Sequence, residues 1–479
     1  KVATVFTKPF RALERSIVGA EGDTRFPWRV GGALYIASFG LQLVFLQAYF
    51  WDDWMIYFSM SASERRTYWL GEGFPPYVHA VIEFLLRNNP IAFHLLSLAI
   101  YFAVGVLIFH ILKRLQIWSP TVNQRITLFS LVLPINSARA AMIILPYSIS
   151  VLLFFVAWLM LLSKRKITVA ASFIVFFFSF YTTSVIPFFT LPILGFVFLE
   201  WNRQKRFTKM VWIKASMILF APAYYLIVSR LIWKPSTNRT DYFTPQLNGL
   251  IRAALLVLAS FVIGLFIIRK AMKKHLPFES ALLVSLGMIA ISFGSVAYFA
   301  AGRLVDLSEW LQFLVPRSSS WDSRSQLLHG LGISLVLVGL VGEINSYAKK
   351  LSYRALMSFC ILLNFTFMTG YYVDYLKQES ILHSFSAANL EDNSVLMIRD
   401  NTDQFSARGR NLRSYEWEGM ILKATGKKVK AVDEAFVFCS SDSAVPNVLV
   451  EMNPGRGRLA TLVKRDAGIL VSYTQINPC

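Results

Sequence analysis

Charged residues are scarce in this sequence. Asp, Glu, Lys and Arg make up 16% of its 479 residues, whereas about 25% is usual in soluble proteins. Hydrophobic residues reach 55%, and several apolar runs have the ~18–20 residues needed to cross a hydrocarbon core. The shortage of charge excludes an ordinary soluble protein and indicates a polytopic membrane protein.

Acidic residues are the rarer charged class, with 28 Asp and Glu against 48 Lys and Arg. The resulting net charge of +20 is also found in proteins that bind nucleic acid. In this chain, however, the basic residues cluster in short loops between apolar runs, a pattern that orients membrane proteins. We therefore expect membrane lipids as partners and no nucleic acid.

Cysteine is nearly absent, and the three present show no Cys-x-x-Cys metal spacing. Cys360 falls in an apolar run and is expected to be a packed side chain. Cys439 and Cys479 lie in a polar region and could pair if that region faces an oxidising compartment. The sequence also contains no Gly-rich phosphate loop, Gly-x-Ser-x-Gly elbow or Cys/His nucleophile pattern.

Eleven apolar segments could cross the membrane, which predicts a mainly α-helical fold. Residues 77–88 carry an apolar stripe at helical spacing but are too short to span, which predicts an interfacial helix lying flat on the membrane. The eleven segments lie near residues 28–50, 91–112, 126–138, 146–163, 167–181, 185–200, 210–231, 247–268, 278–301, 325–346 and 354–374.

The loop charges predict sidedness. With the N-terminus in the cytoplasm, every cytoplasmic loop is basic, as at Lys113 and Arg114 or at Lys270 and Lys273, whereas the opposite loops hold scattered basic residues. This asymmetry follows the positive-inside rule. We expect a multi-pass protein of the inner (plasma) membrane, with the interfacial helix and the C-terminal region on the outer side.

The composition becomes polar and nearly neutral after about Lys377. Strand-like runs at 394–398, 435–439, 448–451 and 468–473, with a helix-like run at 415–425, predict a small α/β domain. The expected organisation is a cytoplasmic segment over 1–27, a membrane domain over 28–376 and a periplasmic or extracellular domain over 377–479.

The segment Phe50-Trp51-Asp52-Asp53-Trp54 is the strongest candidate site. Its two carboxylates directly follow the first apolar run, and tryptophan is typical of the membrane interface. Partial desolvation there raises the pKa of a carboxylic acid and favours proton acceptance. Isolated acidic residues in loops are usually solvated charges, but the position at the membrane boundary favours a catalytic role for Asp52 and Asp53.

Basic residues on the same predicted face are candidate phosphate ligands, because a guanidinium group matches phosphate geometry. They are Arg139, between two spans, and Arg317 and Arg324 in the last long outer loop. Lipid-headgroup contacts or ion pairs with nearby acidic residues are the alternatives. We favour Arg324, because it opens a span at headgroup depth.

Trp54, His79 and His329 complete the residues predicted to contact substrate. His79 lies one helical turn before Glu83, a spacing that can bind a metal. Without a third ligand nearby, we expect these two to form a polar pair on the helix. His329 follows Arg324 by five residues and is expected either near the site or hydrogen-bonded within a helix.

The order of these features resembles the GT-C superfamily of membrane glycosyltransferases. The first helix at 28–50, the acidic pair Asp52-Asp53 and the flat helix at 77–88 look like the start of such an enzyme. Residues 136–162, with Arg139 and then Leu145-Pro146-Tyr147, look like the second outer loop and following helix. The likeness covers residues 28–375 and is closest to bacterial glucosyl transferase II and related O-antigen-modifying enzymes.

The resemblance implies transfer of a sugar from a polyprenyl-phosphate donor to a glycan, lipid or protein acceptor, with inversion of the anomeric carbon. One carboxylate, Asp52 by preference with Asp53 as its partner, would accept the proton of the acceptor hydroxyl. Arginines would neutralise the departing phosphate, so both carboxylates, Arg139 and Arg324 should line one cavity. No cofactor is implied, and a divalent metal, if one assists, has no ligand set beyond the acidic pair.

Two other classes of protein compete with this interpretation. A transporter or lipid flippase would need a charged or broken pathway, which Pro134 and Pro187 could supply, but the spans carry few acidic residues. A non-catalytic membrane subunit of an envelope complex would leave the carboxylates without a role. The acidic pair at the end of the first span favours the enzyme.

Overall fold

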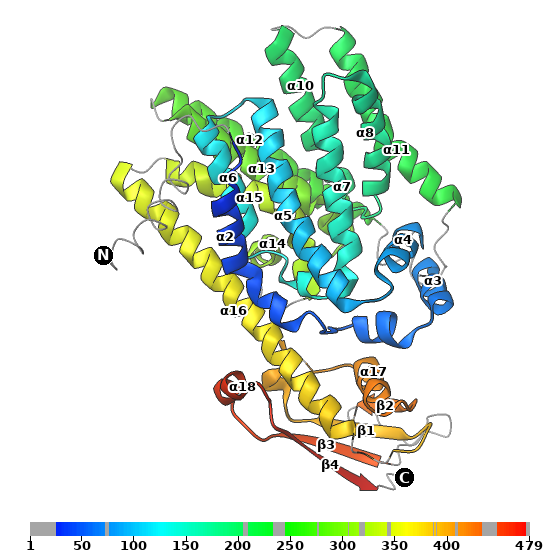
Figure 1. Cartoon of the computed structure of the whole chain (residues 1–479). Helices are drawn as coiled ribbons and strands as arrows, with labels where there is room; N and C mark the ends of the chain where they lie inside the picture. Colours follow the sequence, from blue (N-terminus) through cyan, green and yellow to red (C-terminus); the bar gives the residue numbers. More distant parts are fainter. Residues whose placement is uncertain are drawn as a thin grey trace.

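The protein is mainly helical, and a small sheet is attached at one end of the helical bundle (Figure 1). The computed structural model describes residues 25–71, 76–204, 209–232, 245–274, 277–304, 306–315, 321–342, 346–386, 388, 390–407, 411–433 and 448–475. Most of the predicted cytoplasmic segment lies outside these residues.

The bundle combines long α-helices with short 3-10 and π-helical segments. In chain order they are α2 (Trp28–Phe39), η1 (Gly40–Phe45), η2 (Trp54–Ser59), α3 (Ala62–Gly71), α4 (Pro76–Leu86), α5 (Pro90–Leu115), α6 (Pro120–Val132), η3 (Ser137–Ala140), η4 (Met142–Ile144), α7 (Leu145–Leu161), α8 (Lys166–Ser179), α9 (Val185–Phe188), α10 (Thr190–Gln204), α11 (Lys209–Ile232), α12 (Leu247–Lys273), α13 (Phe278–Ala300), α14 (Leu307–Leu314), η6 (Trp321–Leu328), α15 (Gly330–Gly342) and α16 (Ser346–Ser386).

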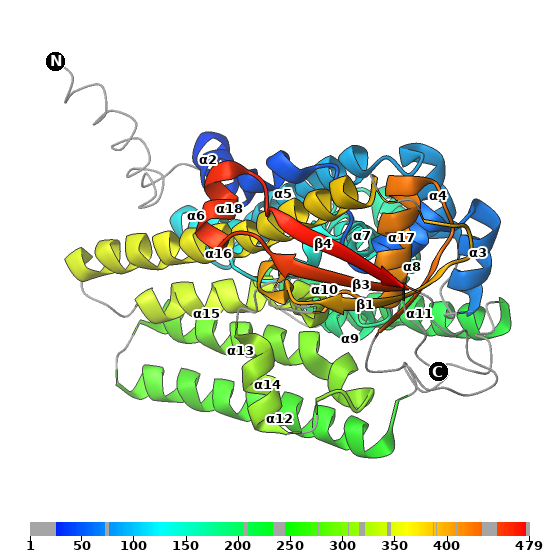
Figure 2. The ribbon, with the colours of Figure 1, turned by 90° about the horizontal axis from the view of Figure 1, so that it is seen from below.

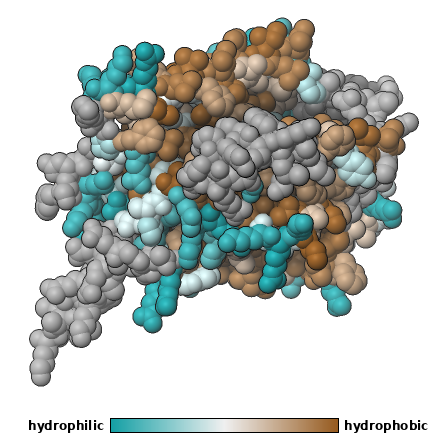
Figure 3. Space-filling view, turned by 90° about the horizontal axis from the view of Figure 1, so that it is seen from above, coloured by the Kyte–Doolittle hydropathy of each residue, from teal (hydrophilic) through white to brown (hydrophobic). Residues whose placement is uncertain are grey.

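Several of these helices could cross a membrane. Shorter apolar helices accompany the long ones, and α12 exposes Leu255, Leu258 and Phe266 on the outside of the bundle. Hydrophobic side chains cover much of the surface that Figure 3 shows, as a lipid environment requires. The described residues contain five helices of sufficient length and hydropathy: Pro90–Leu115, Met142–Leu161, Leu247–Lys273, Phe278–Ala300 and Ala348–Ser386.

The segment predicted as the first span is not one continuous helix. The α-helix α2 ends at Phe39, the tighter 3-10 helix η1 follows, and Trp51 has a positive φ of 55°. Gly40 lowers the helix propensity at the break, and Gln42 turns inward, where its Nε2 lies 3.2 Å from Nδ1 of His94. A π-helix, η2, comes directly after the acidic pair.

The C-terminal unit is a four-stranded sheet with the order β2-β1-β3-β4. Strands β1 (Val395–Asp400), β2 (Lys430–Asp433) and β3 (Val448–Pro454) are parallel, and β4 (Ile469–Gln475) is antiparallel to β3. The predicted helix is present as α17 (Ser414–Thr425) and ends at Gly426, whose φ is 74°. The small α/β unit is therefore confirmed, whereas the run at 435–439, Cys439 and Cys479 lie outside the described residues.

Helix α16 belongs to both units, so no linker exists at the predicted boundary. It continues for 41 residues from the bundle to the sheet. Lys377 is fully buried, and its Nζ lies 2.7 Å from Oδ2 of Asp400 at the end of β1. Asp374, one turn earlier, accepts a hydrogen bond of 2.7 Å from the N–H of Ala407. These contacts fix the sheet to the end of α16.

Glycines allow helices α13 and α15 to approach each other closely. A Cβ added to Gly287 of α13 would lie 2.7 Å from the carbonyl oxygen of Gly332 in α15, and one added to Gly332 would lie 2.8 Å from that of Gly287. Small residues that bring backbones together are typical of helix interfaces in membranes.

Replacing Gly287 with Ala is therefore expected to force the two helices apart and to destabilise the protein by about 1–3 kcal/mol. The matched control is Gly32→Ala in α2, where an added Cβ meets no atom within 4 Å. The thermal midpoint of purified protein should fall for Gly287→Ala and stay level or rise for Gly32→Ala. Equal midpoints would contradict the packing argument.

Candidate functional site

Asp53 is a buried carboxylate that holds two chain segments together. Its side chain is 0% exposed, and Oδ2 accepts the N–H groups of Phe50 at 3.0 Å and Met142 at 2.8 Å. Oδ1 accepts the N–H of Ile143 at 2.8 Å. Burial raises the pKa of Asp53 to about 7, against the opposing effect of these three donors. Asp53 thus anchors η4 to the acidic turn.

Asp52 points the other way, toward the C-terminal unit. Its side chain is half-buried, and Oδ1 accepts a hydrogen bond of 2.6 Å from the hydroxyl of Tyr415 in α17. The adjacent carboxylates therefore diverge. Asp53 points into the helical bundle, and Asp52 points into the junction between the bundle and the C-terminal unit. Of the two, only Asp52 is partly exposed.

One face of α17 covers the acidic segment. Gly419 rests on Trp54, since an added Cβ would lie 3.0 Å from Cβ of Trp54. Lys423 places its Nζ 5.3 Å from the ring centroid of Tyr49 and 5.5 Å from that of Trp54. Trp54 is consequently buried beneath α17, and a positive charge stands beside the acidic turn.

Sequence reasoning missed these α17 residues. Tyr415, Gly419 and Lys423 are spaced four apart, so a predicted helix at 415–425 already places them on one face. Nothing in that spacing names the surface they meet, because Asp52 is 363 residues away along the chain.

Arg139 is buried inside the bundle. Its guanidinium carbon lies 3.7 Å from the ring centroid of Phe39 and 4.4 Å from that of Tyr101. Its Nη2 donates to the carbonyl of Ile135 at 3.0 Å, and its Nε to that of Asn136 at 3.3 Å. These contacts let Arg139 stabilise the loop that carries it.

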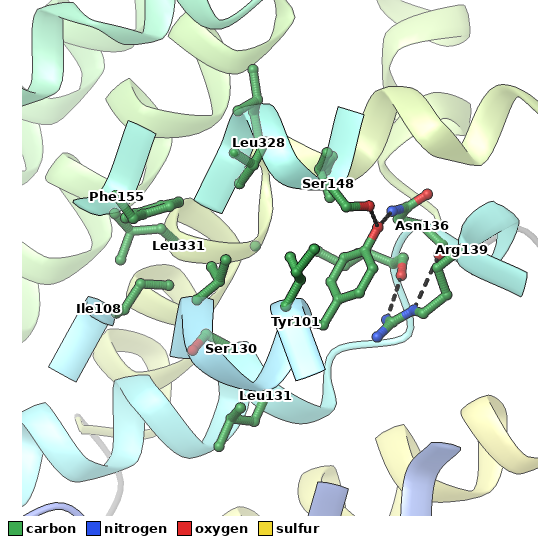
Figure 4. Close-up of a pocket in the computed structure, with 16 residues that line it drawn as sticks. Tyr101, Ile108, Ser130, Leu131, Asn136, Arg139, Ser148, Phe155, Leu328 and Leu331 are labelled. Atoms are coloured by element: carbon green, nitrogen blue, oxygen red, sulfur yellow. Dashed lines mark hydrogen bonds between the residues drawn. The ribbon is translucent and has the colours of Figure 1, made fainter. Parts of the chain in front are cut away.

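A cavity of about 50 Å³ lies beside Arg139 (Figure 4). Its polar lining consists of Tyr101, Ser130, Asn136, Arg139 and Ser148. Such a volume holds a few water molecules and not a sugar phosphate. Among the described residues, neither aspartate nor Arg324 lines it, so this cavity is not the shared one that we expected.

Helix η6 packs on the loop that carries Arg139. Oγ of Ser323 accepts the N–H of Ala138 at 2.9 Å, and Oε1 of Gln326 accepts that of Asn136 at 3.3 Å. Arg324 is half-buried on this helix, and Arg317 lies outside the described residues. The loop at 136–144 therefore connects the segment of Arg324 with Asp53.

The two histidines predicted to contact substrate, His79 and His329, are both buried. His79 stacks on Trp69 with ring centroids 3.7 Å apart, and its Nε2 contacts the hydroxyl of Tyr181. Burial lowers the pKa of His79 to about 3, which keeps the ring neutral at physiological pH. Nε2 of His329 lies 2.9 Å from Oγ of Ser295 in α13, within the helices.

The predicted pair of His79 and Glu83 is wrong. Glu83 instead forms an ion pair of 2.8 Å with Arg65 of α3, because α3 folds back beside α4. In the part of the chain that the structure describes, no three His, Cys, Asp or Glu side chains form a group that could hold a metal ion.

Comparison with known proteins finds no matching family and no matching curated protein. The fold itself is that of a mainly helical protein with several helices apolar enough to cross a membrane and a small α/β unit on the last of them.

Proposed function

We propose that the protein is an inverting membrane glycosyltransferase that moves a sugar from a polyprenyl-phosphate donor to a glycan, lipid or protein acceptor. The observation that carries the proposal is the division of roles within the acidic pair. Both oxygens of Asp53 accept backbone N–H groups, whereas Asp52 keeps a half-buried carboxylate at the junction of the two units.

Asp52 is the general base in this proposal. Tyr415 donates to Oδ1 of Asp52, which orients the carboxylate and leaves Oδ2 to accept the proton of an acceptor hydroxyl. The acceptor oxygen then bonds to the anomeric carbon as the bond from that carbon to the phosphate oxygen breaks. A positioned carboxylate of this kind contributes about 10²–10⁴-fold to a rate.

Lys423 and Arg324 are the basic residues proposed to neutralise the departing lipid phosphate. Lys423 stands over Trp54 in the junction, and Arg324 lies on the helix that packs against the Arg139 loop. Arg139 itself is buried against aromatic rings, so we assign it to holding that loop.

The membrane arrangement remains part of the proposal. Eleven crossings with a cytoplasmic N-terminus would place the acidic turn and the C-terminal unit on the outer side. The basic loops support this arrangement, and a donor carried in the membrane could then approach the junction from the lipid.

The test is sugar transfer in membranes that contain the protein and a polyprenyl-phosphate-linked sugar. Asp52→Asn is expected to lower the rate by at least about 100-fold without loss of folded protein. Glu391→Gln, an exposed acidic residue of the C-terminal unit, should transfer at the original rate. Full activity of Asp52→Asn would remove Asp52 as the base, and no transfer by the unaltered protein from any such donor would reject the enzyme.

Transport of a lipid or solute is the second candidate, because helices end or break near two prolines. Helix α6 ends before Pro134, and the short α9 around Pro187 separates α8 from α10. Broken helices form binding sites in many transporters. Substrate flux across liposomes without any sugar transfer would favour this candidate.

A further inference from the structure

The short helix α18 (Arg458–Lys464) exposes large apolar side chains outside the bundle. Leu459 is 76% exposed and Val463 is 77% exposed. The two are four residues apart and therefore share one face of the helix. Apolar side chains presented in this way by a polar unit mark a contact surface.

The depth of α18 is fixed by its contact with α16. Nη2 of Arg458 lies 3.8 Å from the position of a Cβ on Gly370, and the two helices lie side by side in both ribbon views (Figures 1 and 2). About 24 Å of helix, at 1.5 Å per residue, separates Gly370 from Arg354 at the basic end of α16. A hydrocarbon core is ~30 Å thick, and any helix tilt places Gly370 deeper.

The exposed surface of α16 supports the same depth. Phe359 is 57% exposed, Leu362 62% and Phe365 50%, so an apolar face suited to lipid continues almost to the level of Gly370. α18 therefore stands at the boundary between hydrocarbon and headgroups, on the bundle's side of the sheet (Figure 1).

The basic residues of α18 indicate that its partner is anionic lipid. Arg458, Lys464 and Arg465 are exposed at the two ends of α18, beside the apolar pair. An apolar face flanked by basic residues binds the interface of a membrane that contains anionic lipid. An aqueous protein partner would not account for the depth set by α16.

We propose that α18 anchors the C-terminal unit to the membrane. Leu459 and Val463 insert into the leaflet beside that unit, and Arg458, Lys464 and Arg465 bind anionic lipid headgroups. This role does not depend on the proposed sugar transfer. It would hold the sheet, and with it α17, at a constant height over Asp52.

Nitroxide labels test the insertion in the full-length protein in lipid nanodiscs. Leu459→Cys and Val463→Cys are labelled in a background of Cys360→Ala, Cys439→Ser and Cys479→Ser, and Thr474→Cys on the exposed far end of β4 is the control. Labels at 459 and 463 should collide more often with oxygen and severalfold less often with a water-soluble nickel chelate than the label at 474. Equal nickel accessibility at all three positions overturns the proposal.

Varying the lipid composition of the nanodiscs tests whether the basic residues of α18 bind anionic headgroups. Protection of the 459 label should be greater in nanodiscs with phosphatidylglycerol than in pure phosphatidylcholine, and Arg458→Gln, Lys464→Gln and Arg465→Gln together should abolish the difference. Amide exchange of residues 458–464 in the unaltered protein gives the same comparison if the cysteine-free background does not fold. Protection that persists in detergent and rises with protein concentration would assign the face to a second copy and reject the membrane.

Discussion

Asp53→Asn is expected to destabilise the protein by about 3 kcal/mol at pH 8, where the carboxylate is charged. Three backbone N–H groups converge on its two oxygens, and hydrogen bonds to a charged group contribute about 1.5–3 kcal/mol each. Asn offers one oxygen and turns an NH₂ group toward the remaining donors. At least one buried N–H would lose its acceptor, and η4 would lose its attachment to the acidic turn.

The thermal midpoint of purified protein measures this loss, and Asp52→Asn is the matched control. Asp52 is half-buried and gives up a single hydrogen bond with Tyr415, which predicts a loss of about 1 kcal/mol. The two neighbouring substitutions should therefore have different effects. Asp53→Asn should mainly lower the thermal midpoint, and Asp52→Asn should mainly lower the rate of the proposed sugar transfer. A normal midpoint for Asp53→Asn would refute the anchoring role.

The role of Asp53 can also be tested by measuring the stability of the unaltered protein and of Asp53→Asn as a function of pH. Burial raises the pKa of Asp53 from the ordinary 3.8 to about 7, so the folded state binds a proton that the unfolded state releases between these values. The stabilisation of the folded state by protonated Asp53 is therefore complete below about pH 4 and is lost as pH rises through 7. The gap between the unaltered protein and Asp53→Asn should widen as pH falls from 8 to 5.

The sequence predicted elements whose signals are local. Strands β1, β3 and β4 were predicted from short apolar runs, and the end of α17 from the glycine that follows the helical run, Gly426. The divergence of Asp52 and Asp53 also follows from their adjacency. Each of these features needs information from only a few neighbouring residues.

Features that depend on distant partners were not predictable. The break after Phe39 reflects an inward-facing Gln42 whose partner His94 is 52 residues away, and no hydropathy window contains both. Arg139 was expected to face phosphate because it is charged. Its guanidinium instead packs on two aromatic rings, and charge alone does not distinguish these environments.

The predicted domain boundary illustrates the same limit. The polar composition after about Lys377 suggested the end of the membrane domain. Asp374 and Lys377 are, however, both buried and form hydrogen bonds with the C-terminal unit. Composition records that a residue is polar, but it does not record whether water or another side chain satisfies it. The continuous helix α16 was therefore divided in the sequence interpretation.

Lys377→Met is expected to cost about 3–5 kcal/mol, the usual effect of removing one partner from a buried ion pair. Lys377 is fully buried, with Nζ 2.7 Å from Oδ2 of Asp400 and 2.8 Å from Oγ of Ser406. Its loss leaves the Asp400 carboxylate, only 8% exposed, without a counter-charge. The sheet should loosen from α16, which amide exchange in β1 would detect.

Adding the second substitution Asp400→Asn tests whether the unpaired carboxylate causes the loss of stability, because it removes that charge. Lys377→Met with Asp400→Asn should be more stable than Lys377→Met alone, whereas Lys428→Met, at an exposed position, should change neither stability nor exchange. Since α17 of the same unit orients Asp52 through Tyr415, sugar transfer should fall with the first variant and recover partly with the double one. Loss of β1 protection without any change in transfer would show that the C-terminal unit does not contribute to the reaction.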